Sequence, residues 1–116
     1  MNKDLLIFIE HILESIENID SFTENSSEAS FLKNKEKQSA VIRQIEIIGE
    51  AVKNIPKSFR KNYPQVPWVK IAGMRDKLMH QYFGIDLKTV WKVAKENLPD
   101  LKNQMLDIKK DLTKIE

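Results

Sequence analysis

Apolar residues recur every three or four positions along most of the chain, which is the spacing of amphipathic helices. The first segment follows Asn2, a residue type that caps helices, and its apolar stripe consists of Leu5, Ile9, Ile12, Ile16 and Ile19. The polar stretch SFTENSSEAS interrupts the pattern, and a short extra turn is expected around residues 27–32. The stepping then predicts a second helix over about residues 35–55, with a stripe of Val41, Ile45, Ile48, Val52 and Ile55.

Prolines mark the region between the second and third helices. Pro56, Pro64 and Pro67 leave room for at most one short helix, over residues 57–63. Proline suits the first turn of a helix, so a third helix is expected to begin near Pro67. Gly84 is expected to end it, because glycine takes the left-handed conformation of a C-terminal cap without steric cost.

The last helical segment is expected to start at Asp86, a capping residue, with Ile85 and Val90 at the spacing of a hydrophobic staple. Pro99 lies inside this segment and predicts a kink or short break at residues 97–98, because proline removes one backbone hydrogen bond. The apolar stripe passes the proline without changing phase: Leu87, Trp91, Ala94, Leu98, Leu101, Met105, Ile108, Leu112 and Ile115. No segment reads as a strand. The pattern predicts an all-α, antiparallel four- to five-helix bundle forming one domain over residues 1–116.

Composition excludes several classes of function. The chain has no cysteine, so it has neither disulfides nor thiolate metal ligands, and its two histidines make a poor zinc site. No apolar run reaches the roughly 18 residues needed to cross a bilayer, and acids occur early in the N-terminal helix, unlike in a signal peptide. A cytoplasmic protein without a membrane span, cofactor or metal is therefore expected.

Charge is distributed unevenly, although the net charge is only +2. Residues 1–30 hold one lysine and seven acids, whereas residues 31–83 hold eleven Lys and Arg residues and four acids. A basic middle section is able to attract phosphate, but such runs are more often the solvated faces of helices. Charge alone therefore leaves a nucleic-acid partner as one of two interpretations.

The stretch GMRDKLMHQYFG, residues 73–84, contains the candidate chemistry. On a helix, Tyr82 lies about 20° around the axis from Arg75, whereas His80 lies about 140° from it. Asp76 stands one turn before His80, where a carboxylate is able to accept an imidazole N–H. Arg75 and His80 of one straight helix cannot easily hold one phosphate, so a site would need a second copy of the helix across a two-fold axis. The alternative is that these are ordinary surface and core-edge side chains.

The string Arg75-x-x-x-x-His80-x-Tyr82 resembles the R-x4-H-x-Y signature of the HepT-like branch of the HEPN superfamily. The segments AVIRQIEIIGEAVKNIP and PWVKIAGMRDKLMHQYFGIDLKTVW are also similar to that family's second helix and motif helix. The resemblance extends over about residues 3–112, and Asp76 fits the family's preference for a polar residue after the arginine.

This resemblance implies a metal-independent RNA endonuclease, the toxin of a type II HEPN/MNT toxin–antitoxin system. His80 would act as general base or acid, and Arg75 would stabilise charge on the phosphoryl oxygens. Asp76 would support them, and two motifs in a homodimer or higher oligomer would supply both a base and an acid. Tyr82 would be adenylylated by the cognate nucleotidyltransferase antitoxin, which is MntA-like. The alternative within the same resemblance is an inert nucleotide- or partner-binding subunit of a nucleotidyltransferase complex.

Overall fold

The computed structural model describes residues 3–80 and 86–114, apart from the side chains of Arg75, Leu78, Met79 and His80. Its elements in chain order are α1 (Lys3–Thr23), α2 (Glu28–Phe31), α3 (Lys35–Lys53), α4 (Lys57–Arg60), α5 (Trp68–His80), α6 (Leu87–Lys92), the π-helical turn η2 (Val93–Asn97) and α7 (Leu98–Thr113). No strand occurs in this part of the chain, and the predicted all-α class is confirmed.

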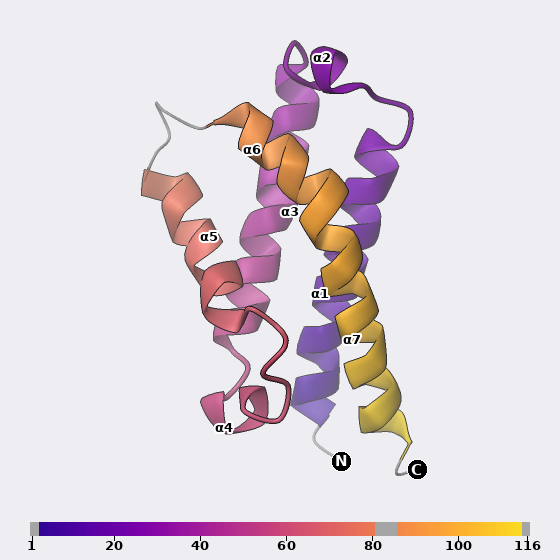
Figure 1. Ribbon diagram of the computed structural model, residues 1–116, viewed down its shortest axis with the longest axis vertical. Coiled ribbons are helices and arrows are strands. Elements are labelled where there is room, and N and C mark those ends of the chain that lie inside the picture. Colours follow the sequence, from indigo (N-terminus) through magenta and orange to yellow (C-terminus); the bar gives the residue numbers. More distant parts are fainter. Residues whose placement is uncertain (1–2, 81–85, 115–116) are drawn as a thin grey trace.

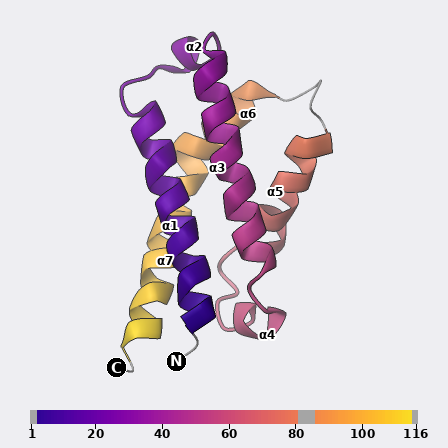
Figure 2. The same ribbon diagram turned by 180° about the vertical axis from the view of Figure 1, so that it is seen from behind.

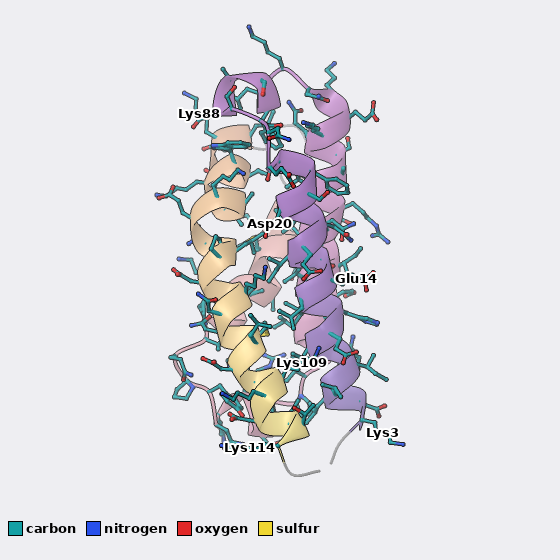
Figure 3. All side chains as sticks on the ribbon, turned by 90° about the vertical axis from the view of Figure 1, so that its right-hand side faces the viewer. Lys3, Glu14, Asp20, Lys88, Lys109 and Lys114 are labelled. Atoms are coloured by element: carbon teal, nitrogen blue, oxygen red, sulfur yellow. The ribbon has the colours of Figure 1, made fainter. Side chains whose placement is uncertain are left out.

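Four long helical segments form an antiparallel bundle (Figures 1 and 2). Helix α1 packs against α3 on one side and α7 on the other, and α5 packs against the opposite side of α3. Helix α6 runs through η2 into α7, so the last segment crosses the front of the bundle in Figure 1. Charged side chains cover the outer surface of α1 and α7, among them Glu14, Asp20 and Lys109 (Figure 3).

Local capping residues set the helix starts that the sequence predicts. Ser27 and Ser30 bond reciprocally in a capping box at the start of α2, and the side chain of Asn34 accepts from the backbone N–H of Lys37 at 3.0 Å. The predicted extra turn and second helix are therefore confirmed. Pro67 lies just outside α5 and not in its first turn: its carbonyl accepts the N–H of Ile71 at 3.0 Å.

Helix α4 is shorter than the predicted range of residues 57–63, and it ends at Arg60. The guanidinium of Arg60 donates to the carbonyl oxygens of Val52 and Ile55 at 2.7 and 2.9 Å. These carbonyls belong to the C-terminal end of α3 and the turn after it, where carbonyl oxygens have no backbone N–H donor within the helix. Arg60 therefore ties α4 to the end of α3.

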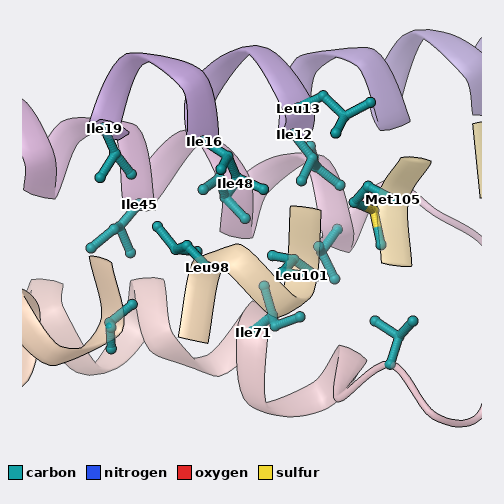
Figure 4. Packing of buried hydrophobic residues seen from close by; sticks show 14 of the residues in the cluster. Ile12, Leu13, Ile16, Ile19, Ile45, Ile48, Ile71, Leu98, Leu101 and Met105 are labelled. Carbon is teal, nitrogen blue, oxygen red and sulfur yellow. The ribbon is translucent and has the colours of Figure 1, made fainter. Parts of the chain in front are cut away.

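The core lies between the four long segments and is aliphatic in its centre (Figure 4). The predicted stripes supply most of the buried residues, although Leu87, Trp91 and Leu112 of the last stripe are half-buried. The stripe residues Ile9, Ile12, Ile16 and Ile19 of α1 are fully buried. They meet residues from all the other long segments: Ile45, Ile48, Ile71, Leu98, Leu101 and Met105. Burying an aliphatic side chain of this size contributes roughly 1.5–3 kcal/mol, so these stripes hold the bundle together.

The helix before Pro99 is not broken, but it continues as a wider, π-helical turn. Residues 93–97 form a π-helical turn, in which the N–H of Leu98 bonds to the carbonyl of Val93, five residues back. Pro99 then occupies the first turn of α7, where its missing N–H is tolerated. The irregularity thus lies at residues 93–97, just before and overlapping the predicted residues 97–98, and it is a π-helical turn, not a break in the helix.

The expected capping roles of Asn2 and Gly84 and the staple residue Ile85 lie outside the described residues. Asp86 is confirmed as the cap of α6: its side chain accepts the N–H groups of Lys88 and Thr89 at 3.1 and 3.3 Å.

Candidate active site

Helix α5 carries most of the motif, and its N-terminal half is firmly anchored. Trp68 is buried, and its indole N–H donates to the carbonyl of Tyr63 at 2.9 Å. Ile71, one turn later, is 8% exposed and belongs to the core. The backbone then continues as an unbroken α-helix to His80. Arg75, Asp76 and His80 therefore stand on one continuous helix.

Asp76 is the motif residue whose contacts the structure describes. Both of its carboxylate oxygens accept from the ammonium group of Lys53, at 3.0 and 3.1 Å. The two side chains are 48% and 38% exposed, so the pair contributes at most about 1 kcal/mol to stability. Its consequence is geometric, because it joins the C-terminal end of α3 to the middle of α5.

The side chains of the remaining predicted site residues lie outside the described part. The backbones of Arg75 and His80 belong to α5, but their side chains are not described, and neither is any part of Tyr82. The expected contact of Asp76 with His80 thus stays a prediction. The structure does place Asp76 beside Lys53, a partner that the sequence did not indicate because 23 residues separate the two.

Asp86, the first described residue after residues 81–85, caps the start of α6. Its carboxylate accepts from the hydroxyl of Thr89 at 2.8 Å as well as from backbone N–H groups. The hydrogen bond from the Thr89 side chain, followed by the one from the Thr89 backbone, lowers the pKa of this carboxyl. Asp86 is therefore a charged cap at neutral pH, and α6 starts at a defined place opposite the end of α5.

Some of the basic side chains in residues 31–83 make contacts within the protein. Lys53 binds Asp76, Arg60 bonds to the end of α3, and the ammonium of Lys37 donates to the hydroxyl of Ser26 at 2.6 Å. Lys70 and Lys77 on α5 are exposed. The positive charge available to a ligand beside the motif is therefore smaller than the sequence count suggests, and it includes these two lysines.

A groove of about 430 Å³ opens between α5, α3 and the segment α6–η2–α7. Met74, which directly precedes Arg75, lines it, together with Lys70 on α5 and Lys92 on α6. Sequence reasoning did not predict this groove, because apolar periodicity gives the buried face of each helix but not the distance between two helices.

Two further observations concern metal binding and membrane insertion. Within them, no three His, Asp or Glu side chains gather as a metal ion would require. In the same part of the chain, no helix has the length and apolar character needed to cross a bilayer.

Comparisons with known proteins match most of the chain. Residues 12–108 match the family described as Ribonuclease HepT-like. The chain is 49% identical over 114 residues to "Gamma-glutamylcyclotransferase and putative RNase MJ0434" of Methanocaldococcus jannaschii, covering 98% of this chain and 51% of that protein. It is 47% identical over 110 residues to "Putative RNase MJ1216" of the same organism, covering 95% of this chain and 91% of that protein.

A third relative comes from a different genus. The chain is 48% identical over 103 residues to "Probable ribonuclease HepT" of Thermococcus cleftensis, covering 89% of this chain and 94% of that protein. It thus spans about half of the first relative and nearly all of the other two. No solved structure is significantly similar to it.

These matches extend over the whole bundle and include the motif segment. The family match covers α3, α5 and α6 completely, with residues 75–82 inside it. The resemblance seen in the motif is therefore confirmed over most of the chain, and the protein belongs to the ribonuclease HepT-like family, a branch of the HEPN superfamily.

Proposed function

We propose that this protein is a metal-independent RNA endonuclease and the toxin of a type II HEPN/MNT toxin–antitoxin pair. The observation that carries the proposal is that one unbroken helix, α5, holds the R-x4-H pattern in a chain of the ribonuclease HepT-like family. The ribonuclease names of its relatives support the same chemistry.

The residue types suit transesterification of RNA. The 2′-oxygen attacks the neighbouring phosphorus while His80 accepts its proton, and histidine has an ordinary pKa of about 6.5. The bond to the 5′-oxygen breaks, and this oxygen takes a proton as it leaves. The products are a 2′,3′-cyclic phosphate and a 5′-hydroxyl. Arg75 stabilises the charge that develops on the phosphoryl oxygens, because its planar fork matches two of them.

The spacing on α5 favours a site made by two protomers. Arg75 and His80 are five residues apart, so they differ by about 7.5 Å along the helix axis and about 140° around it. Both are held on a straight helix that the Lys53–Asp76 pair joins to α3. A two-fold pair of α5 helices brings the arginine of one protomer towards the histidine of its partner.

Tyr82 is the proposed point of regulation. The partner nucleotidyltransferase would transfer AMP from ATP: the phenol oxygen attacks the α-phosphorus and pyrophosphate leaves. The added phosphodiester brings a negative charge close to Arg75 and repels RNA phosphates. The toxin is then inactive while its antitoxin is present.

Alanine variants test the nuclease proposal, and the chain supplies matched controls. Arg75→Ala and His80→Ala are each expected to lower RNA cleavage by about 100-fold or more, because each removes a group that acts in the transition state. His11, exposed on α1, is the chain's other histidine. Arg43 on α3 makes a surface pair with Glu46 at 3.3 Å. His11→Ala and Arg43→Ala are expected to cut as fast as the unchanged protein.

The same assay separates nuclease from binding module. Cleavage is expected to persist in EDTA, because no step uses a metal. Loss of cleavage on chelation would contradict metal independence. Equal activity of all four alanine variants would leave the inert subunit as the better interpretation. Growth arrest on expression should follow cleavage in each variant.

A further inference from the structure

The groove beside the motif helix has a floor of aliphatic side chains. We call it the α5–α7 groove. It lies where α5 and the last helical segment diverge over α3, and its floor is formed by Ile45, Ile48, Ile71, Met74, Leu98 and Leu101. Figure 4 shows Ile45, Ile48, Ile71, Leu98 and Leu101 among the packed side chains of the core. No aromatic ring lines the groove among the described residues.

The rim of the groove is polar and carries lysines on both sides. Lys70 on α5 and Lys92 on α6 both line it, and both are exposed. Neither makes a hydrogen bond or ion pair with its side chain among the described residues. Their charges are therefore available to an anionic ligand.

Two more lysines extend these rows towards the motif end of α5. Lys77 follows Lys70 by two helical turns on nearly the same line, and Lys88 precedes Lys92 by one turn. Both are exposed. Asp100, near the start of α7, is the one acid lining the groove among the described residues. The positive charge thus lies at the α5 and α6 side, close to the motif.

The groove lies along the helix that carries the proposed catalytic arginine. Met74 lines it and Arg75 follows in the chain, while Lys70 lies about 7.5 Å from Arg75 along the helix axis and about 140° around it. The π-helical turn contributes Val93 and Asn97 to the opposite wall. Such turns are rare and often occur at functional sites.

We propose that the α5–α7 groove holds the RNA strand next to the cleaved bond, with Lys70 and Lys92 on its phosphates. This inference rests on the proposed function. Charge complementarity favours a phosphate backbone as the occupant, and contacts of lysines to phosphates carry no information about base sequence. Binding in the groove therefore discriminates little between bases.

Binding of a non-cleavable strand tests the groove. The probe is a labelled 2′-O-methyl oligouridylate, which lacks the attacking hydroxyl, and the readout is fluorescence anisotropy. The double variant Lys70→Ala/Lys92→Ala is expected to bind it about tenfold more weakly, with a salt slope smaller by about 1.4. The matched control is Lys33→Ala/Lys110→Ala, which removes two exposed lysines that do not line the groove. It should bind as the unchanged protein does, and equal losses in both doubles would overturn the proposal.

Methyl resonances locate the strand without any substitution. On addition of the same probe, the methyl signals of Ile71, Met74 and Leu101 are expected to shift more than those of Ile9 and Ile16, which belong to the core but do not line the groove. Shifts absent from the groove methyls would overturn the proposal. If the groove methyls instead shift with protein concentration and do not respond to the probe, a second copy of the chain occupies the groove and the proposal is overturned.

Failure of this inference is distinguishable from failure of the proposed function. If Arg75→Ala abolishes cleavage but the Lys70/Lys92 double leaves affinity unchanged, the groove assignment is wrong and the nuclease assignment survives. If the groove methyls respond to the probe but the unchanged protein cuts no RNA, the nuclease assignment is wrong and the groove assignment survives.

Discussion

The phenol of Tyr63 donates a hydrogen bond to Asp111 Oδ2 at 2.9 Å and joins the turn after α4 to the end of α7. Burial, with the hydrogen bond to Asp111 and the charge of that carboxylate adding to it, raises the pKa of Tyr63 to about 12. Since the folded state favours the protonated phenol, its contribution to stability is complete below pH 10 and is lost as the pH rises towards 12. Spectrophotometric titration is expected to show a phenol ionising near pH 12 that Tyr63→Phe removes. A titration unchanged by that substitution would contradict this assignment.

Tyr63 is also the control for the proposed modification, because the chain has two tyrosines. Incubation with the partner nucleotidyltransferase, ATP and Mg²⁺ is expected to add adenylate to Tyr82, since a phenol held by Asp111 and ionising late is a poor nucleophile. Mass spectrometry with peptide mapping gives the site. Tyr82→Phe should remain unmodified and active, and Tyr63→Phe should be modified like the unchanged protein. The regulatory proposal fails if Tyr82→Phe is modified as fully as the unchanged chain.

Single residues differ in how far the sequence predicts them. Asp86 was predicted as a cap and is one, because capping depends on groups two and three residues away. The pairing of Asp76 with Lys53 could not be predicted, because it depends on the rotation of α5 against α3. The positions of Arg75 and His80 on a helix were predicted, while the directions of their side chains stay predictions.

At the scale of elements, apolar periodicity predicted the long helices to within a few residues. Hydrophobic burial selects one face of each helix, and this selection leaves a period that is readable in the sequence. The π-helical turn shows what the sequence pattern could not predict. Pro99 predicted that regular bonding must fail near residues 97–98, but whether the chain would kink or widen depends on packing around η2. Lys95 contributes to that packing: its ammonium donates to the carbonyl of Thr23 at 3.0 Å and lies 5.2 Å from the Trp91 ring centroid.

The Lys53–Asp76 pair is expected to position α5 more than to stabilise the fold. Asp76→Ala should change the free energy of unfolding by less than about 1 kcal/mol, because the pair is exposed. It should lower kcat for RNA cleavage by about tenfold, since even a small shift of α5 against α3 misplaces the motif side chains. Lys53→Met should have the same effect, and the double variant should be no worse than either single change.

Two control substitutions, one in a comparable ion pair and one conservative, complete the test of the Lys53–Asp76 pair. Arg43 and Glu46 form a comparable surface ion pair within α3, and Glu46→Ala should leave cleavage unchanged. Asp76→Asn should recover part of the rate, because the amide oxygen still accepts a hydrogen bond from Lys53. Additive losses for Asp76→Ala and Lys53→Met would show that the two residues act separately.

At the scale of the molecule, the sequence predicted an all-α antiparallel bundle, and the structure has this architecture. It did not predict the α5–α7 groove, because the divergence of two helices is set by the sum of their contacts and not by either stripe. The proposed dimer also belongs to this scale, since it follows from the spacing of Arg75 and His80 and not from any one contact.

Mixing the unchanged protein with the double variant Arg75→Ala/His80→Ala tests the central claim, that two protomers build one RNA-cutting site. After subunit exchange at equal concentrations, about half of the unchanged chains are paired with a double-variant chain. Each mixed dimer then lacks an arginine and a histidine that its sites need. Sedimentation of the double variant alone must first show that it still dimerises. Cleavage per unchanged chain is expected to fall to about half in the equal mixture and further with excess variant. Cleavage per unchanged chain that stays constant at every mixing ratio would contradict the two-protomer site.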